Sequence, residues 1–383
     1  MDLQADRCWI SRLSLTSYRN YSSLTIEPDQ RPIVLTGSNG SGKTNLMEAV
    51  SLYSSGTGLR RAAYADLAKM NSSTPWAISA KIHTAHGDFT IGTGLSPKSQ
   101  MGERASRIVR VDGEPSSTNA LSDYLHISWL TPAMDGLFTG PASERRRFLD
   151  KLISCFDPGY QKRINQFERA MRQRNKLLEA DNIQPVLFEG LEVQMAEIGV
   201  SIAATRCEAI AQLAGTIYTR KESKNNTFPW AELSLEGDLE TWLADYPAVE
   251  AEDLYIRALA QGRMRDRAAK RTLTGPHRSD LLVNHGPKAM PARYCSTGEQ
   301  KALLVGLVLA HTELVKQINS GAAPIVLLDE IAAHFDEERR AGLFAEILDL
   351  GVQAWMTGTD SEMFASFGEN AQFFTVDNGK VGP

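Results

Sequence analysis

The chain has 383 residues, 42% of them hydrophobic, so it can bury a large core and is expected to contain two or three domains. Its formal net charge is −5, so any surface for a polyanion must be a local basic patch on an acidic body. The four cysteines form no C-x-x-C pair, and the longest apolar run, residues 303–310, is too short to span a bilayer. These features argue against a disulfide scaffold and predict a cytoplasmic protein with no membrane contact.

Alternating apolar residues predict strands in the first part of the chain. Short strands are expected over residues 9–15 and 24–26, separated by the turn Tyr18-Arg19-Asn20-Tyr21. The same alternation returns over residues 76–82, 88–94 and 106–112, the last ending in the hairpin-type pair Asp112-Gly113. The pattern predicts an antiparallel β module inserted beside a nucleotide-binding core.

Between these strands lies the octet Gly37-Ser38-Asn39-Gly40-Ser41-Gly42-Lys43-Thr44, preceded by a buried strand over residues 33–36 and followed by a helix over residues 45–54. The octet fits the phosphate-binding pattern G-x-x-x-x-G-K-[ST] in its expected strand-to-helix setting. Its glycines leave backbone N–H groups open to a phosphate, and the helix N-terminus adds partial positive charge. We expect Lys43 to reach the β- and γ-phosphates and Thr44 to hold Mg²⁺. A glycine-rich loop that only caps a helix is the alternative.

Two helical patterns follow a strand over residues 127–130. Apolar residues recur at near-heptad spacing over residues 160–180 and again over residues 191–213, with a break through Asn182 and Pro185. This predicts an antiparallel helical hairpin, a short coiled coil.

Basic residues gather in three clusters on predicted helices. The first is Arg145, Arg146 and Arg147, which are unfavourable beside the positive end of a helix dipole. Either Glu144 and Asp150 compensate them, or a nucleotide or a DNA phosphate does. The second lies on the polar faces of the first hairpin helix and comprises Lys162, Arg163, Arg169, Arg172, Arg174 and Lys176. The third ends a helix over residues 253–271 and comprises Arg263, Arg265, Arg267, Lys270 and Arg271. Each can be solvated surface or a phosphate contact.

Nucleotide chemistry returns near the C-terminus. Ser296-Thr297-Gly298-Glu299-Gln300 directly precedes a helix over residues 302–315 and offers a hydroxyl, bare N–H groups and a helix dipole to an anion. A buried strand over residues 325–328 then ends in Asp329 and Glu330. We expect Asp329 to complete the Mg²⁺ shell and Glu330 to orient and deprotonate the attacking water. A strand that merely ends in an acidic turn is the alternative.

In this order the motifs resemble the ABC-type ATPase head, in which a phosphate loop, an S-x-G-x-Q signature and a strand ending in Asp-Glu are followed by a D-loop and a switch strand. Here most of the chain separates Lys43 from Asp329, as in the SMC and RecF group of DNA-maintenance proteins, and the short hairpin excludes a long-armed SMC protein. Further segments resemble the RecF family. They are Tyr18-Arg19-Asn20-Tyr21, the segment from Gly140-Pro141 to Arg145-Arg146-Arg147-Phe148-Leu149-Asp150, Thr274-Gly275-Pro276-His277-Arg278, Ser296-Thr297-Gly298-Glu299-Gln300-Lys301 and Met356-Thr357-Gly358-Thr359-Asp360.

The resemblance implies an α/β fold in which an ABC-type P-loop head is assembled from both chain ends, with an inserted antiparallel β module and a central helical domain. The implied domains are residues 1–150, the first part of the head; residues 151–272, a helical arm; and residues 273–383, the second part of the head.

The implied function is ATP-dependent DNA binding in recombinational repair and replication-fork recovery, with slow, DNA-dependent ATP hydrolysis. The implied cofactors are ATP and Mg²⁺. The implied partners are duplex DNA at single-strand gaps, a second copy of the chain, and the proteins RecR, RecO and RecA. An ABC-type ATPase that powers a permease or a nuclease is the alternative, although no nuclease motif is visible and the hairpin does not suit a permease.

Carried onto this chain, residues 37–44 bind ATP, Thr44 and Asp329 hold Mg²⁺, and Lys43 and Glu330 support hydrolysis. Ser296 and Gly298, with Gln300 in the same motif, contact the γ-phosphate held by the other subunit, and Asp336 lies at the dimer seam. Two departures stand out. The segment Pro132-Ala133-Met134-Asp135 has no glutamine for a further ligand. Thr357 or Thr359 stands where transporter heads have histidine, which is compatible with slow turnover.

Overall fold

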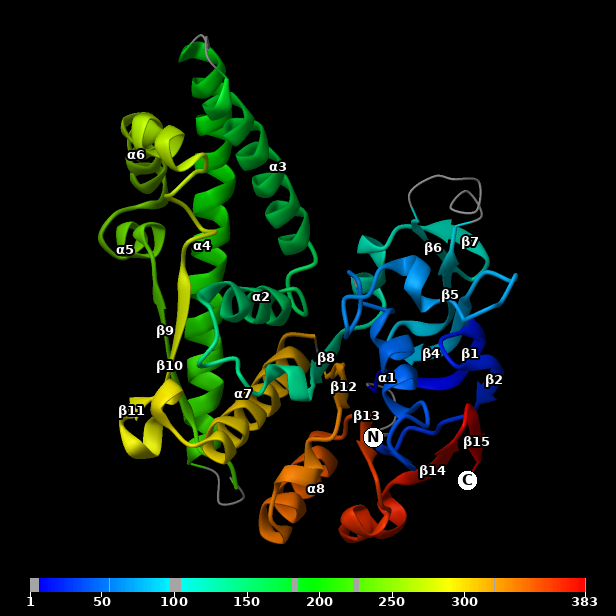
Figure 1. Cartoon of the computed structure of the whole chain (residues 1–383). Helices are drawn as coiled ribbons and strands as arrows, with labels where there is room; N and C mark the ends of the chain where they lie inside the picture. The colour runs from blue at the N-terminus through cyan, green and yellow to red at the C-terminus, as the bar shows by residue number, and fades with distance from the viewer. Residues whose placement is uncertain are drawn as a thin grey trace. The chain divides into compact units, whose positions relative to one another are not determined.

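The computed structural model describes residues 7–54, 56–96, 105–180, 185–222, 227–319 and 321–382 (Figure 1). The chain forms two compact units. Unit 1 contains Met1–Asp135, Arg220–Pro229 and Thr297–Pro383, and unit 2 contains Gly136–Thr219 and Trp230–Ser296. Unit 1 therefore draws on both ends of the chain. The domain boundaries expected at residues 150 and 272 stay a prediction.

A mostly parallel sheet in unit 1 is built around the strand that leads into the phosphate loop. The strand order is β15-β14-β3-β13-β12-β8, and every pair is parallel except β14 with β15. All residues of β3 and β12 are buried, as expected of parallel strands that are covered on both faces. The strands are β3 (Ile33–Thr36), β8 (Ile127–Leu130), β12 (Ile325–Leu328), β13 (Ala354–Gly358), β14 (Gln372–Asp377) and β15 (Lys380–Gly382).

The second sheet of unit 1 is antiparallel, as predicted, with the order β2-β1-β4-β5-β6-β7. The turn Asp112-Gly113 joins its last two strands. The strands are β1 (Trp9–Tyr18), β2 (Tyr21–Ile26), β4 (Ala77–Thr84), β5 (Gly87–Leu95), β6 (Arg107–Val111) and β7 (Glu114–Ser116). The α-helices that lie wholly in the described part of unit 1 are α1 (Lys43–Ser51), α7 (Thr297–Ile318) and α8 (Glu337–Leu350).

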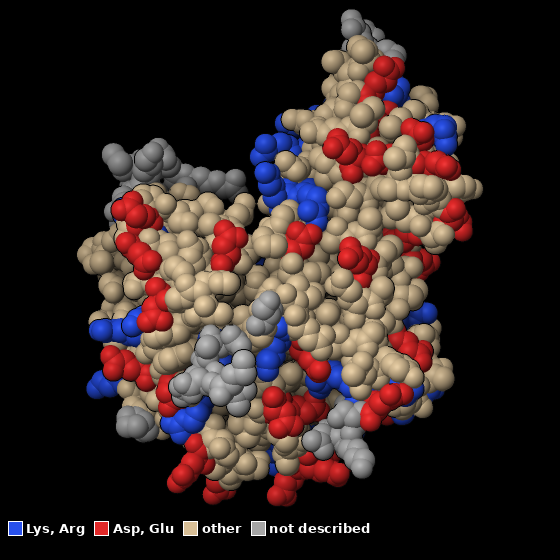
Figure 2. All heavy atoms as spheres, turned by 180° about the vertical axis from the view of Figure 1, so that it is seen from behind, with Lys and Arg blue, Asp and Glu red and all other residues tan. Residues whose placement is uncertain are grey.

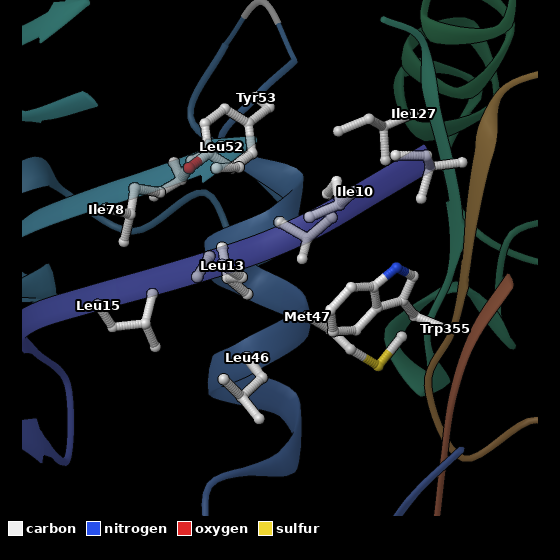
Figure 3. Packing of buried hydrophobic residues seen from close by; sticks show 14 of the residues in the cluster. Ile10, Leu13, Leu15, Leu46, Met47, Leu52, Tyr53, Ile78, Ile127 and Trp355 are labelled. Carbon is white, nitrogen blue, oxygen red and sulfur yellow. The ribbon is translucent and has the colours of Figure 1, made fainter. Parts of the chain in front are cut away.

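The hydrophobic core of unit 1 fixes the position of α1. Leu46 and Met47 of this helix are fully buried and lie close to Ile10 and Leu13 of β1, with Trp355 of β13 beside Met47 (Figure 3). A nine-residue helix is marginal in water by itself, so tertiary packing stabilises it. The packing therefore sets where the phosphate loop ends and the helix begins.

Unit 2 contains the predicted helical hairpin. Arg163 of α3 donates to Thr205 of α4 at 3.2 Å, and Arg174 of α3 donates to Glu192 of α4 at 3.1 Å, so the two helices run antiparallel. Pro185 begins α4, whereas the predicted break at Asn182 lies outside the described residues. The helices are α2 (Ala142–Ile153), α3 (Tyr160–Glu179), α4 (Pro185–Lys221), whose last two residues belong to unit 1, α5 (Asp238–Asp245) and α6 (Ala248–Ala269).

A small antiparallel sheet completes unit 2, in the order β11-β10-β9. Its strands are β9 (Ala231–Glu236), β10 (Asp280–His285) and β11 (Met290–Pro291). In the part of the chain that the structure describes, no helix combines the length and the hydropathy needed to span a membrane.

Candidate nucleotide site

The phosphate loop needs glycine at two positions for steric reasons. Gly37 has φ of 142°, and a Cβ there would lie 2.2 Å from the carbonyl oxygen of Val376 in β14. Gly42 has φ of 123°, and a Cβ there would lie 2.6 Å from the side chains of Asn20 and Tyr21. Residues other than glycine rarely adopt such backbone conformations. The loop is therefore packed closely against the backbone of β14 at Gly37 and against two side chains at Gly42.

The loop also collects groups that suit an anionic ligand. The Lys43 Nζ donates to the carbonyl oxygens of Gly37 and Ser38 at 2.6 and 2.9 Å, so the ammonium lies inside the loop. Burial lowers the pKa of Lys43, and the negative charges of Glu330 and Asp329 oppose this shift. Among the described residues, the buried Ser41 hydroxyl has no hydrogen-bond partner. An unsatisfied buried hydroxyl beside a lysine and a helix N-terminus fits a bound phosphate.

Hydrogen bonds join Thr44 to the acidic end of β12, although 285 positions separate Thr44 from Asp329. The Thr44 hydroxyl donates to the Asp329 Oδ1 at 3.1 Å, and the Thr357 hydroxyl donates to the same oxygen at 2.8 Å. Burial raises the pKa of Asp329, while the two hydroxyl donors oppose the increase. The sheet therefore brings together the hydroxyl and the carboxylate that were predicted to hold Mg²⁺.

These oxygen groups fit Mg²⁺ in chemistry. Mg²⁺ in phosphate sites is held by one or two carboxylates together with substrate phosphates and water, and a protein cage is not needed. In the described ranges, no group of three His, Cys, Asp or Glu side chains able to hold a metal occurs.

Glu330 follows Asp329 in an uncommon backbone conformation. Its φ is 55°, in the left-handed region, and its backbone N–H donates to the Thr357 hydroxyl at 2.8 Å. Such a conformation in a residue other than glycine persists where the surroundings enforce it, and functional sites are a common place for it. The Glu330 side chain is half-buried, and its charge acts on Lys43. The Glu330 carboxylate therefore lies near enough to the phosphate loop for its charge to act on Lys43.

The sequence did not reveal which residues support the loop from behind. The Asn20 amide donates to the Ser41 carbonyl at 3.1 Å and accepts a bond from the Asn45 amide at 2.7 Å. The Tyr21 hydroxyl donates to the Gly42 carbonyl at 3.0 Å. Both residues lie in the turn that resembles a RecF-family segment, and that resemblance was the only signal of their importance.

A buried ion pair, also missed, anchors α1. Arg19 donates to both carboxylate oxygens of Glu48 at 2.7 Å, and the Glu48 side chain is fully buried. Arg60 lies 3.8 Å from the same carboxylate and donates to Asn45 at 2.7 Å. The charge of Arg60 also acts on Asp329 and favours the ionised carboxylate. These contacts connect the turn after β1 to the helix that carries Thr44.

The remaining site residues expected from the sequence concern a second copy of the chain. Ser296 and Gly298 lie at the start of α7, and Gln300 is buried in its first turn. The exposed Asp336 caps α8 by accepting a bond from the Arg339 N–H at 2.8 Å. Their roles toward a nucleotide or a dimer seam stay predictions.

The segment without a glutamine has a partner of its own. Asp135, at its end, pairs with Lys301 of α7 at 2.9 Å, and this lysine is buried. The ion pair connects the segment that follows β8 to the helix of the signature motif.

This chain is similar to known proteins over nearly its whole length. A family model described as the RecF/RecN/SMC N terminal domain matches residues 9–381. The DNA replication and repair protein RecF of Mesorhizobium japonicum is 52% identical over 376 residues, which cover 98% of this chain and 97% of that protein. The chain belongs to the RecF family. RecF of Rhizobium etli is also 52% identical, over 97% of this chain and 98% of that protein. The predicted relationship to DNA replication and repair proteins is confirmed.

Solved structures show the same fold. The recombination mediator protein RecF, solved with ATP as part of the RecFOR pathway, is 21% identical and superposes with a TM-score of 0.82, covering 98% of this chain and 97% of that one. An Smc head domain of Pyrococcus furiosus is 15% identical, with a TM-score of 0.54 over 98% and 95% of the two chains. The predicted ABC-type head, assembled from both chain ends, is therefore confirmed.

Proposed function

We propose that this RecF-family chain is an ATP-dependent DNA-binding protein of recombinational repair and replication-fork recovery. One observation carries the proposal: Thr44, Asp329, Thr357 and Glu330 form a continuous hydrogen-bonded network that joins the phosphate loop to the acidic end of β12. Such a network can report the state of a bound nucleotide to both ends of the chain. In this proposal ATP closes a dimer on DNA, and slow, DNA-dependent hydrolysis releases it.

Each residue of the site has a task in this proposal. Lys43, which contacts the carbonyls of Gly37 and Ser38, would bind phosphate oxygens, and the Thr44 hydroxyl and the Asp329 carboxylate would hold Mg²⁺. Bound MgATP supplies the γ-phosphate, whose transfer to water ends the closed state. The Glu330 carboxylate would orient that water and accept its proton.

The proposal requires a second copy of the chain. Ser296, Gly298 and Gln300 lie at the N-terminal end of α7, where the helix dipole favours an anion. We assign them to the γ-phosphate of the other copy, with Asp336 at the seam. We further propose a cytoplasmic protein that binds duplex DNA at single-strand gaps and acts with RecR and RecO to support the loading of RecA. A solved relative is described as a recombination mediator in the RecFOR pathway, which supports these partners.

The test is the nucleotide dependence of DNA binding. We expect the chain to bind a gapped duplex about tenfold more tightly with ATP than with ADP, a ratio in the usual range for coupled sites. Lys43→Met should bind DNA equally well with ATP and with ADP, because the phosphate loop then lacks its cation. Lys81→Met, at an exposed lysine of β4, is the matched control and should behave like the wild type. Fluorescence anisotropy measures the affinities. Equal affinity with ATP, with ADP and without nucleotide would contradict the proposal.

A further inference from the structure

Contacts within unit 2 already engage the first basic cluster, at the start of α2. Arg145 donates to both carboxylate oxygens of Asp280 at 2.8 and 2.7 Å, and Arg146 donates to the Ser279 carbonyl at 2.6 Å. Arg147 pairs with Glu144, as one of the two alternatives predicted. Asp150, the other expected partner, instead accepts from Arg206 at 2.9 Å. These arginines stabilise the unit and do not need an external anion.

The third cluster, at the end of α6, is also partly engaged. Arg263 pairs with the buried Glu192 at 2.5 Å, and Arg265 donates to the Thr274 hydroxyl at 3.1 Å. Arg267 is exposed and donates to the Ala180 carbonyl at 2.9 Å. Lys270 and Arg271 at the helix end are also exposed. These two cations on adjacent residues cover little length of a helical polyanion.

The second cluster, on α3, divides into two groups. Arg174 was predicted on a polar face, but this is wrong: its side chain is fully buried, because Glu192 and Asp266 supply carboxylates inside the unit. Arg163 pairs with Asp157. These contacts fix the rotation of α3 about its axis and so decide which side faces the solvent.

The solvent side of α3 carries a stripe of cations. Lys162, Arg169 and Lys176 recur every seven residues, two helical turns, and therefore lie on one face. All three are exposed, and none has an ion pair or hydrogen bond to another residue in the described ranges. Figure 2 shows Lys and Arg side chains gathered on the side of the hairpin along which α3 runs.

Neutral amides fill the space between these cations. Asn165, Gln166 and Gln173 are exposed on the same side of the helix. The nearby acid Glu168 is paired with Arg172 at 3.3 Å. The stripe is therefore a continuous run of hydrogen-bond donors and positive charge on a chain whose net charge is −5. Global charge cannot explain such a local concentration.

We propose that this stripe holds the sugar–phosphate backbone of duplex DNA, with Lys162, Arg169 and Lys176 each contacting a phosphate. The inference rests on the DNA-binding function proposed above and adds the surface that performs it. The stripe is about 21 Å long at 1.5 Å per residue, which matches roughly six base-pair steps of 3.4 Å. Lysine, arginine and amide side chains commonly contact DNA phosphates, and contacts to phosphates carry no direct information about the base sequence. The surface thus suits a protein that recognises DNA without a fixed sequence.

The test is the salt dependence of DNA binding by the full chain with MgATP. The stripe variant combines Lys162→Gln, Arg169→Gln and Lys176→Gln. Its affinity for a gapped duplex should fall about tenfold or more, and the slope of log K against log salt should become shallower by about 2.7, from 0.9 for each phosphate contact. A charge-keeping variant, with Lys162→Arg, Arg169→Lys and Lys176→Arg, should retain both the affinity and the slope.

A matched control removes three exposed cations elsewhere: Arg12→Gln in β1, with Lys270→Gln and Arg271→Gln at the end of α6. It should keep the wild-type slope. Equal binding by the stripe variant and the wild type would overturn the inference, and so would an equal loss in the control, which would indicate net charge alone. Failure of the wild type to bind DNA with ATP would instead refute the proposed function. Unchanged ATP binding by the stripe variant confirms that it folds.

Discussion

At the scale of a single residue, His277 shows how burial makes unit 2 sensitive to acid. Its Nε2 lies 3.0 Å from the Thr272 carbonyl oxygen, so this nitrogen carries the proton of the neutral ring and donates it. The Nδ1 is buried without a partner, and the ring lies against Phe167. Burial lowers the pKa of His277 from 6.5 to about 4, and the charges of Arg278 and Arg146 contribute to the decrease. A second proton would have no acceptor at Nδ1.

This geometry predicts a pH dependence of stability. The unfolded ring binds a proton near pH 6.5 and the folded ring only near pH 4, so the unfolded state gains protons first as the pH falls. The contribution of His277 is complete above pH 6.5 and is lost progressively toward pH 4, by about 3 kcal/mol in total. Urea unfolding at several pH values should therefore show a flatter profile for His277→Gln than for the wild type.

The exposed His86 provides the control for this prediction. His86→Gln should keep the wild-type profile, because this side chain is exposed in the folded chain. His126, whose pKa burial also lowers to about 4, leaves part of the pH dependence in every variant. An identical profile for His277→Gln and the wild type would contradict the account of His277.

At the scale of elements, sequence patterns predicted the helices and strands whose formation depends on residues close together in the chain. The strand β3, the phosphate loop and the helix after it are continuous in sequence, and the octet identified them. By contrast, β14 was not predicted, although it pairs with β3, because its place beside that strand depends on the return of the distant C-terminus. The strand β9 was missed for the same reason, since β10, its partner, lies more than 40 residues away. The role of Asn20 in the site could not be predicted for the same reason. Its hydrogen bonds with Ser41 and Asn45 form only when the chain folds.

The helix α3 gives a direct comparison between a buried and an exposed arginine. Arg174 is fully buried and donates to Glu192, Asp266, Thr272 and the Leu259 carbonyl, at distances between 2.7 and 3.1 Å. Heptad spacing alone placed it on the polar side. Its burial depends on carboxylates from α4 and α6, which no pattern within α3 reveals.

Arg174→Met should therefore destabilise the protein strongly, by about 3–5 kcal/mol, because Asp266 and Glu192 would remain buried with fewer cationic partners. Arg172→Met, two positions away, removes only an exposed pair with Glu168 and should cost about 1 kcal/mol or less. Urea unfolding measures both variants. Similar losses of stability in the two variants would contradict the burial of Arg174.

At the scale of the whole molecule, we propose that one chain holds only part of its ATPase site. Unit 1 brings Lys43, Thr44, Asp329 and Glu330 together from both chain ends. That convergence follows from the order of the motifs and the resemblance to an ABC-type head. The signature motif, which begins at Ser296, contributes on this account to the site of a second copy. Because that contact is intermolecular, neither local patterns nor the fold of one chain contains it.

The most direct test is the mass of the full chain in solution with MgATP, measured by light scattering for Glu330→Gln with and without gapped DNA. This substitution removes the proposed base and keeps the shape of the side chain, so ATP should bind and remain. We predict a mass twice that of one chain for Glu330→Gln, further favoured by DNA, and no such shift for Lys43→Met. Glu114→Gln, at an exposed position of β7, should behave like the wild type. A Glu330→Gln chain that binds ATP and yet keeps the mass of a single copy would contradict the account.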